Sequence, residues 1–241
     1  MTKLNPKTLG IIGGVGPEST IDYYRSLIAL YKERKADGSY PEIIINSIDL
    51  KKEIEMVERN RLADLTTYLV EEIEKLGRAG AHFGLIASNT PHIVFDAVRM
   101  RSPIPLISIV ESAAVFAKAR GLTKIALFGT KFTMTGDFYP KVFSREGIEL
   151  AQPETADQDY IHDKYMNELV NGIFHDQTRA SLLSVVDRMK DKHQIDGVIL
   201  AGTELPLILC DDSCQGIPCL NTTRIHVEAA INWMLGNQGS K

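Results

Sequence analysis

The sequence predicts an α/β fold in which parallel sheets carry helices on both faces. Short runs of Ile, Leu and Val occur without polar alternation, as at 83–87 and 197–201, and such runs are typical of strands that are buried on both faces. They alternate along the chain with longer amphipathic stretches, which is the pattern of parallel strands joined by helical crossovers. An internal repeat, described below, further divides the fold into two similar lobes.

The expected elements follow from these patterns in chain order. The strand at 83–87 runs directly into Ser88, Asn89 and Thr90, and Pro91 after them suits the first turn of a helix. Expected strands cover 8–13, 42–47, 83–87, 105–108, 124–129, 147–150, 197–201 and 217–220. Expected helices cover 17–35, 58–79, 91–100, 109–120, 133–145, 158–174, 177–193 and 222–235.

The two halves of the chain resemble one another. KTLGIIGG at 7–14 is similar to KIALFGT at 124–130, and GLIASNT aligns with VILAGTE so that Ser88 lies opposite Gly202. We expect one lobe over 1–103 plus 213–241, with the last helix packed on it, and the other lobe over 104–212. The strand ends of two such lobes are expected to face each other across a cleft, the usual place for a small-molecule site.

Composition limits the classes of function. The chain has 241 residues, 44% of them hydrophobic and 24% charged, with a formal net charge of −4, so it can bury a full core. Its Lys and Arg residues are scattered among acidic ones, which argues against nucleic acid as a partner and favours a small ligand. No apolar run has membrane-spanning length and the start lacks a signal-peptide pattern, so we expect a cytoplasmic protein.

The cysteines Cys210, Cys214 and Cys219 fall in one short segment. A metal site there needs a fourth ligand such as His226, and the resulting C-x3-C-x4-C-x6-H spacing matches no common structural zinc site. We therefore expect reduced thiols in a loop and a strand, and no bound metal.

Four loops at the expected strand ends carry polar residues that suit a ligand site. In the first, GGVGPEST, Gly16 lets the backbone approach a ligand and Pro17 begins a helix whose N–H groups favour an anion; a plain tight turn is the alternative. In another, GTKFTMTGDFY, Thr130 and Thr133 are suited either to bind a carboxylate or to cap a helix. The remaining two are SNT and GTELP.

Five segments, IIGGVGPESTIDYY, ASNTPH, LFGTKFTM, AGTELP and NTTRIHVEAA, follow one another along nearly the whole chain. In this order they resemble the aspartate/glutamate racemase family. The resemblance implies two pseudo-symmetric flavodoxin-like lobes and racemisation of an acidic amino acid without a cofactor. It also implies two opposed cysteine thiols, of which one removes the Cα proton and the other returns a proton from the opposite face.

The chain departs from the family pattern at both thiols. Ser88 stands where C-N-T-x-H has its cysteine, Gly202 stands where G-C-T-E has it, and Asn221 replaces the aspartate of D-T-T. A thiol has a pKa of about 8.5 and a serine hydroxyl is several units less acidic, so Ser88 needs a neighbouring base to transfer protons. Gly202 offers no side chain, and we expect extra room on its face for a water molecule or a bulkier substrate group.

Candidate bases for Ser88 are Glu204 and His226, with His92 third. A hydrogen-bonding role for Ser88 and a core or surface position for His226 are the alternatives. Expected substrate-binding residues are Gly16, Pro17, Asn89, Thr90, Thr130, Thr133 and Thr203, together with Lys51 for a second carboxylate, for which Lys52 and Lys131 are further candidates. For each lysine, a solvated surface position is the alternative.

Three classes of function remain open. The first is an amino-acid racemase of the aspartate/glutamate type, or a relative that moves a proton on a similar carboxylate, expected to be a homodimer. The second is a homologue that binds an amino acid or dicarboxylate without racemising it, because both thiols are replaced. Lyase chemistry on the same scaffold is a third.

Overall fold

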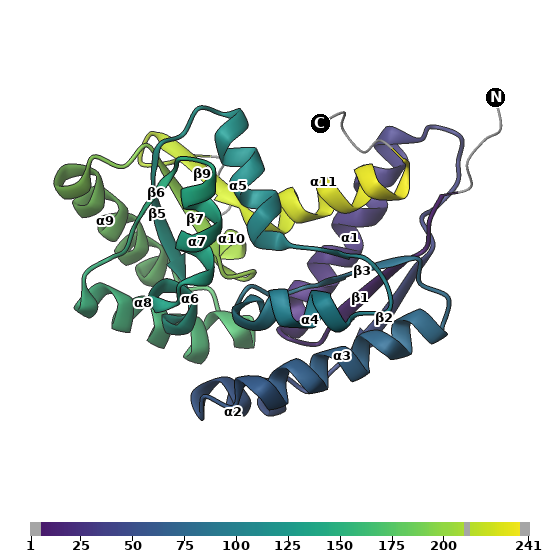
Figure 1. Cartoon of the computed structure of the whole chain (residues 1–241). Coiled ribbons are helices and arrows are strands. Elements are labelled where there is room, and N and C mark those ends of the chain that lie inside the picture. Colours follow the sequence, from purple (N-terminus) through teal and green to yellow (C-terminus); the bar gives the residue numbers. More distant parts are fainter. Residues whose placement is uncertain (1–5, 210–212, 237–241) are drawn as a thin grey trace. The chain divides into compact units, whose positions relative to one another are not determined.

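The computed structural model of the chain describes residues 6–209 and 213–236. The chain divides into two compact units, one comprising Met1–Ile109 with His226–Lys241 and the other comprising Val110–Ile225. Each unit has its own strands with helices packed against them (Figure 1). Within the described residues, every helix is too short or too polar to cross a membrane.

The sheet of the first unit has the strand order β2-β1-β3-β4. Its strands are β1 (Leu9–Gly13), β2 (Ile43–Ser47), β3 (Phe83–Ile86) and β4 (Leu106–Ile107). All neighbouring pairs are parallel. Their carboxyl ends therefore meet at one edge of the sheet, and the residues that follow β1 and β3 are brought together there.

Both faces of this sheet are covered, because alternate residues of a strand point to opposite sides. Leu9 and Ile11 of β1 pack with α1 and α11, whose ribbons lie side by side in Figure 1. On the other face, a Cβ on Gly10 would lie 2.9 Å from the Cβ of Ala81, so the segment after α3 packs directly on the backbone of β1. The helices are α1 (Pro17–Arg34), α2 (Leu50–Glu58), α3 (Leu62–Arg78), η1 (Thr90–Val94), α4 (Phe95–Arg101) and α11 (Thr222–Met234).

The second unit repeats this plan. Its parallel strands follow the order β6-β5-β7-β9, which matches β2-β1-β3-β4, and β8 adds an antiparallel edge next to β9. The strands are β5 (Lys124–Gly129), β6 (Glu149–Ala151), β7 (Gly197–Ala201), β8 (Ser213–Cys214) and β9 (Ile217–Asn221). Ile12 pairs with Ile86 in the first unit and Phe128 pairs with Leu200 in the second, so Ser88 and Gly202, each two residues further along, occupy equivalent places.

The core of the second unit lies between β5, β7 and the helices α8 and α9. One face of α8 and η2 packs into this core through residues spaced four apart, Ile161, Tyr165 and Leu169. The helices of the unit are α5 (Ile109–Ala119), α6 (Lys131–Thr135), α7 (Phe138–Arg145), α8 (Thr155–Asn167), η2 (Leu169–Asn171), α9 (Asp176–His193) and α10 (Leu205–Ile208).

Several helix boundaries differ from the expected ones. The helix expected over 58–79 begins later, at Leu62, because Asn60, with φ at 52°, separates it from the unexpected helix α2. The helix expected over 133–145 is two helices, α6 and α7, since Gly136 has extended backbone angles. The structure groups residues 213–225 with the second unit rather than the first, because β9 pairs with β7.

The expectation of reduced thiols is wrong for two of the cysteines. β8 and β9 form an antiparallel hairpin that brings the Cα atoms of Cys214 and Cys219 within 5.7 Å, and the two residues form a disulfide. That separation lies within the range that a disulfide requires. Cys210 lies outside the described residues.

Candidate active site

The loop after β3 carries the first set of candidate residues. Ser88 is half-buried, Asn89 is only 2% exposed, and η1 begins at Thr90. The Ser88 hydroxyl makes no hydrogen bond to any other residue within 6–209 and 213–236. At the end of a parallel strand, such a hydroxyl can meet a ligand without first breaking an internal bond.

His92 holds this loop to the start of the next helix. Its Nδ1 donates to the Ser88 carbonyl at 2.9 Å, and its Nε2 accepts from the backbone N–H of Ile109 at 3.2 Å. Burial, with a smaller contribution from the neighbouring His226, lowers the pKa of His92 to about 3. A neutral imidazole with both nitrogens engaged positions the loop and has no lone pair left for the Ser88 hydroxyl.

His226, on α11, is also fully buried and neutral. Since a carbonyl can only accept, its Nε2 donates to the Ile107 carbonyl at 3.1 Å, and its Nδ1 therefore accepts from the Tyr23 hydroxyl at 2.9 Å. Burial lowers the pKa of His226 to about 4. His226 thus occupies the core position that the sequence left open as an alternative, and its proposed role as the base for Ser88 needs a rearrangement of these bonds.

Tyr23 is a residue that sequence reasoning missed. It lies on α1 with Leu27 and Tyr31 at four-residue intervals, all three buried. The apolar spacing marks it as a core residue, and nothing local marks its hydroxyl as the partner of a histidine 203 residues away.

The loop after β1 is a tight turn that opens α1. Gly14 and Gly16 have φ angles of 81° and 95°, and a Cβ on Gly14 would lie 2.4 Å from the Ile48 carbonyl oxygen. Thr20 accepts from the Gly14 N–H at 2.9 Å and donates to the Gly16 carbonyl at 3.2 Å. Pro17 follows as the first residue of α1. The turn is explained by this geometry, and anion binding by Gly16 and Pro17 stays a prediction.

The loop after β7 carries the second set. Gly202, Thr203 and Glu204 are buried, and Glu204 is 1% exposed. The Tyr165 hydroxyl, from α8, donates to Glu204 Oε2, and the Thr203 hydroxyl donates to the same oxygen at 3.1 Å. A phenol, a carboxylate and a hydroxyl therefore meet directly after the end of the strand.

The expected extra room at Gly202 is absent. A Cβ built on Gly202 would lie 2.4 Å from Cε2 and 3.0 Å from Cζ of Tyr165, so the tyrosine ring fills the space that a side chain at this position would need. Tyr165 is the second residue that sequence reasoning missed. Its spacing with Ile161 and Leu169 indicates a core position, and only the packing of α8 on β7 brings it to the loop.

Thr130 and Thr133 lie after β5, at the start of α6. Thr130 caps this helix, because its hydroxyl accepts from the Thr133 N–H at 3.2 Å, and the two hydroxyls are 3.1 Å apart. The capping role predicted for Thr130 is confirmed, while carboxylate binding stays a prediction. Lys131 is paired with Asp159 at 2.6 Å.

Lys51 lies in α2, a helix that the sequence did not predict. Its side chain is exposed, and the Lys52 ammonium lies 3.9 Å from the centre of the Tyr68 ring. Glu53, next in sequence, is 1% exposed, and its Oε1 has no hydrogen-bond partner among the described residues. Burial raises the pKa of Glu53 to about 8. A buried carboxyl group that keeps its proton at neutral pH therefore follows two exposed lysines in the sequence.

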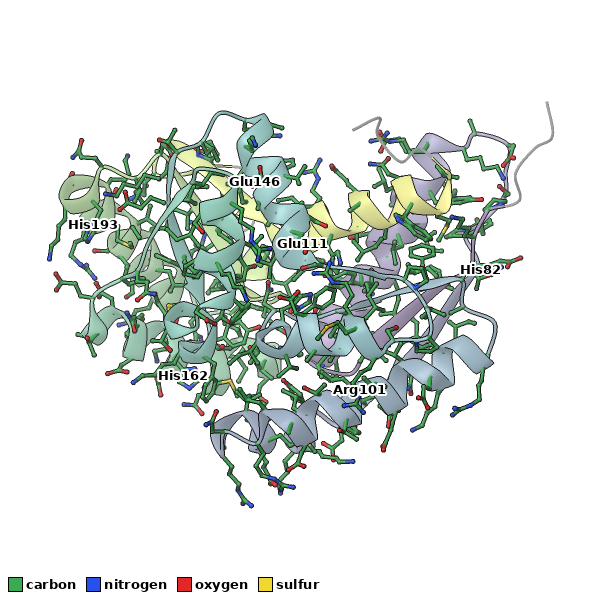
Figure 2. All side chains as sticks on the ribbon, in the orientation of Figure 1. His82, Arg101, Glu111, Glu146, His162 and His193 are labelled. Carbon is green, nitrogen blue, oxygen red and sulfur yellow. A yellow bond between two sulfur atoms is a disulfide. The ribbon has the colours of Figure 1, made fainter. Side chains whose placement is uncertain are left out.

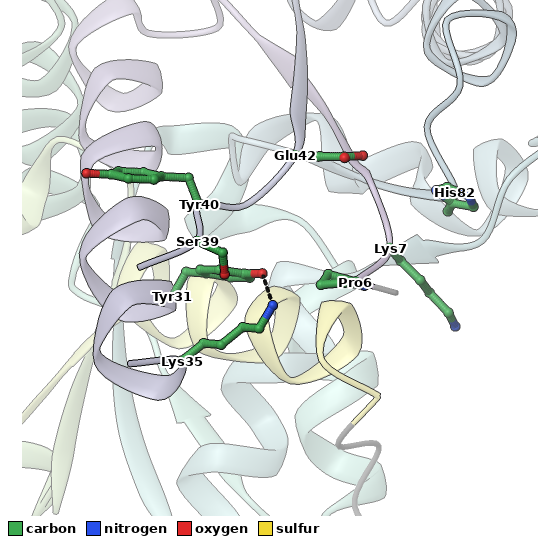
Figure 3. Close-up of a pocket in the computed structure, with 8 residues that line it drawn as sticks. All are labelled: Pro6, Lys7, Tyr31, Lys35, Ser39, Tyr40, Glu42 and His82. Carbon is green, nitrogen blue, oxygen red and sulfur yellow. Dashed lines mark hydrogen bonds between the residues drawn. The ribbon is translucent and has the colours of Figure 1, made fainter. Parts of the chain in front are cut away.

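A cavity of about 480 Å³ lies at the other end of the first sheet, lined by Lys7, Tyr31, Lys35, Glu42 and His82 among others (Figure 3). His82, which is labelled in Figure 2, directly precedes β3, whereas Ser88 follows that strand. Lys35 donates to the Tyr31 hydroxyl at 3.3 Å and pairs with Asp37 at 3.3 Å. The cavity contains none of the predicted site residues. Within the described part of the chain, no three His, Cys, Asp or Glu residues are grouped so as to hold a metal ion.

Comparison with known proteins decides the family. The sequence pattern of the Asp/Glu/Hydantoin racemase family matches residues 12–230, which include all four candidate loops. The chain belongs to this family. The predicted α/β fold, with two lobes of parallel strands flanked by helices, is confirmed.

Individual relatives of this racemase-family protein are similar to it over nearly its full length. The broad specificity amino-acid racemase RacX of Bacillus subtilis (strain 168) is 23% identical over 248 residues, covering 95% of this chain and 99% of that protein. A candidate Asp/Glu racemase from Yersinia pestis has a TM-score of 0.86 at 30% identity, covering 95% and 99%. An aspartate racemase homologue from Pyrococcus horikoshii OT3 has a TM-score of 0.80 at 33% identity, with the same coverage.

The structure thus places each predicted catalytic residue at a strand end or in a buried hydrogen-bond network. Ser88 follows β3, Gly202 and Glu204 follow β7, and His226 lies in α11. That one ligand contacts both loops stays a prediction.

Proposed function

We propose that this protein is an amino-acid racemase that inverts Cα of aspartate, glutamate or a similar carboxylate by proton transfer, without a cofactor. The observation that carries the proposal is the pair of equivalent strand ends. Ser88 lies two residues after the end of β3 and Gly202 directly follows β7, at positions that the strand registers match in two units of the same strand order. Membership of the racemase family, and a relative named as a broad specificity amino-acid racemase, support the same reaction.

The residues of the two loops divide the work of such a reaction. Asn89 and Thr90, with backbone N–H groups near Gly16, are suited to hold the α-carboxylate, because amides, hydroxyls and N–H groups donate to carboxylate oxygens. Thr203 is a further candidate, and its hydroxyl must turn from Glu204 Oε2 to donate to the ligand. Lys51 is the candidate cation for a second carboxylate, and its exposed side chain is consistent with that role. Ser88 is the candidate for proton transfer, or for a hydrogen bond to the developing charge, on one face of Cα.

One observation favours a second candidate function. Gly202 has no side chain, and the buried His92 and His226 are neutral with both ring nitrogens engaged. With these positions supplying no free base, and with Glu204 already accepting two hydrogen bonds, the residues suit a protein that binds an amino acid or dicarboxylate without racemising it.

A chiral assay in D2O separates the two. The protein is incubated with L- and D-aspartate and L- and D-glutamate, and Cα deuterium is measured by NMR alongside the enantiomer ratio. The racemase proposal expects deuterium in the product enantiomer. The binding alternative expects a ligand-dependent rise in melting temperature with no deuterium, and that pattern with all four amino acids would sink the racemase proposal.

A matched pair of serine variants tests the assigned site. Ser88→Ala should lower the racemisation rate by about 100-fold or more, the range for one proton-transfer group. Ser144→Ala, on the exposed side of α7, is the control and should keep the parent rate. Equal rates in the two variants would remove Ser88 from the reaction.

A further inference from the structure

The space beside Gly202 is occupied by an aromatic ring from another element of the same unit. Cε2, Cζ and Cδ2 of Tyr165 lie 2.4, 3.0 and 3.2 Å from the place where a Cβ on Gly202 would stand. Real Cβ atoms do not approach other atoms as closely as the first of these, so this ring position and a side chain at residue 202 exclude each other. Glycine at 202 is the residue that lets α8 present Tyr165 at the end of β7.

The phenol brings a polar atom to this place. The Cζ atom, which carries the hydroxyl, lies 3.0 Å from the place where a Cβ on Gly202 would stand. The phenol oxygen is bonded to Cζ, so it lies close to the region that the polar atom of a side chain at residue 202 would occupy. The hydroxyl donates to Glu204 Oε2, which also accepts from Thr203 at 3.1 Å. Tyr165 and Glu204 are 7% and 1% exposed, so the pair is buried.

The internal repeat allows the position of the Tyr165 hydroxyl to be compared with that of Ser88. In the first unit, Ser88, two residues after the end of β3, carries its own hydroxyl. In the second unit, the residue directly after β7 is Gly202, and the nearby hydroxyl comes from Tyr165, 37 residues earlier in the chain. Each unit therefore has a hydroxyl at the carboxyl end of its third strand in chain order.

We propose that the Tyr165 phenol, relayed by Glu204, is the proton-transfer group that acts on the substrate Cα from the second unit. This inference rests on the proposed racemase function. In one direction the phenol oxygen takes the Cα proton while its own proton passes to the Glu204 carboxylate, and the C–H electron pair stays on the substrate. In the other direction the phenol O–H bond breaks as its proton joins Cα, and the Glu204 carboxyl returns a proton to the oxygen.

The electrostatics of the pair fit this relay. Burial raises the pKa of Tyr165 well above its usual value of 10, and the negative charge of Glu204 raises it further. The resting phenol is therefore protonated at neutral pH, as an acid must be. To act as a base it must lose this proton to a partner, and Glu204 Oε2 is already its hydrogen-bond acceptor.

Tyr165→Phe tests the proposal because it keeps the ring in place and removes only the hydroxyl. We expect a loss of racemisation of about 100-fold or more with aspartate or glutamate, in a variant that remains folded. Deuterium exchange at Cα should persist for one enantiomer without inversion, because the other face still has its own group. A purely structural role for the hydroxyl would not produce this asymmetry. Tyr160→Phe, another tyrosine of α8, is the matched control and should behave as the parent.

A second variant keeps the proposal testable if Tyr165→Phe does not fold. Gly202→Ala keeps the phenol but forces its ring to move, so racemisation should fall by about 10-fold or more while Tyr160→Phe stays unchanged. Parent-like racemisation in both Tyr165→Phe and Gly202→Ala overturns the role of the phenol and leaves the racemase function standing. If the parent protein itself exchanges no Cα deuterium with any of the four amino acids, the proposed function fails and this inference with it.

Discussion

The loops after β3 and β7 follow equivalent strands, yet they use opposite means to place polar groups. After β3, Ser88 supplies its own side chain, and the buried imidazole of His92 holds its backbone carbonyl. After β7, Gly202 supplies no side chain, and the phenol of Tyr165 reaches the same region from α8. The comparison shows that two units with the same backbone plan can carry a polar group at equivalent strand ends, although the side chain comes from the loop itself in one unit and from a helix in the other.

The two loops also differ in how their buried groups are charged. The first unit buries two histidines and the carboxyl Glu53, and burial shifts the pKa values of all three groups away from their usual values. The buried carboxyl of the second unit, Glu204, accepts hydrogen bonds from Tyr165 and Thr203 through Oε2. The three shifts make the stability of the first unit depend on pH.

The largest expected effect is the acid sensitivity that His92 and His226 give to the first unit. Their pKa values are lowered by burial to about 3 and about 4, so below the unfolded value of about 6.5 only the unfolded chain takes up these protons. The free energy of unfolding should be intact above pH 6.5 and fall as the pH drops toward 3, by on the order of 3 kcal/mol or more for each histidine.

Denaturant titrations at a series of pH values measure this loss. The slope of the unfolding free energy against pH gives the number of protons that the chain takes up when it unfolds. His226→Gln should lower this number by about one between pH 6.5 and 4. His175→Gln, at the exposed start of α9, is the control and should keep the parent slope. An unchanged slope in His226→Gln would contradict the neutral buried state of that ring.

The second effect has the opposite sign and comes from Glu53. Burial raises its pKa from 4.5 to about 8, so between these values the unfolded carboxyl is ionised while the folded one keeps its proton. Stability should fall as the pH rises from 4.5 to about 8, by on the order of 4 kcal/mol. Glu53→Gln should remove this dependence in thermal melts, whereas Glu58→Gln, exposed at the end of α2, should retain it. A parallel loss in both variants would assign the dependence to another group.

Cysteine substitutions at the two equivalent positions should show the difference between the loops directly. Ser88→Cys replaces one small side chain by another and should change the free energy of unfolding by less than about 1 kcal/mol. Gly202→Cys must displace the Tyr165 ring and should cost about 1–3 kcal/mol, the range for overpacking a core. Tyr165→Leu combined with Gly202→Cys should be less destabilised than the sum of the single changes. Equal stability of the two cysteine variants would mean that the ring yields without cost.

The smallest expected effect concerns ligand binding by the two threonines. Thr90→Val and Thr203→Val keep the volume and remove one hydroxyl each, so each should weaken binding of aspartate or glutamate by about 1 kcal/mol if the hydroxyl contacts the ligand. Thr203→Val should show the smaller change in affinity, because the Thr203 hydroxyl proton is already donated to Glu204. Calorimetric titration measures both. Unchanged affinity in the two variants would mean that the ligand binds elsewhere.

The sequence alone determined the strands and the order of the fold. The expected strands at 124–129 and 197–201 coincide with β5 and β7, because continuous apolar runs in a parallel sheet carry a strong local signal. The repeat that aligned Ser88 with Gly202 agrees with the paired registers of the two sheets. Family motifs are contiguous in sequence, so the racemase family could be recognised without coordinates.

Only the tertiary structure decided which side chains meet. α2 has charged residues at most positions and was missed, and its Asp49 cap and buried Glu53 depend on local geometry and packing. The disulfide required the β8–β9 hairpin, and the pairing of His226 with Tyr23 joins residues 203 positions apart. In the sequence, the spacing of Tyr165 is that of any core-facing residue of a helix. Its place beside Gly202 is set by how α8 packs against β7, and such long-range packing has no local signal to be read from the chain.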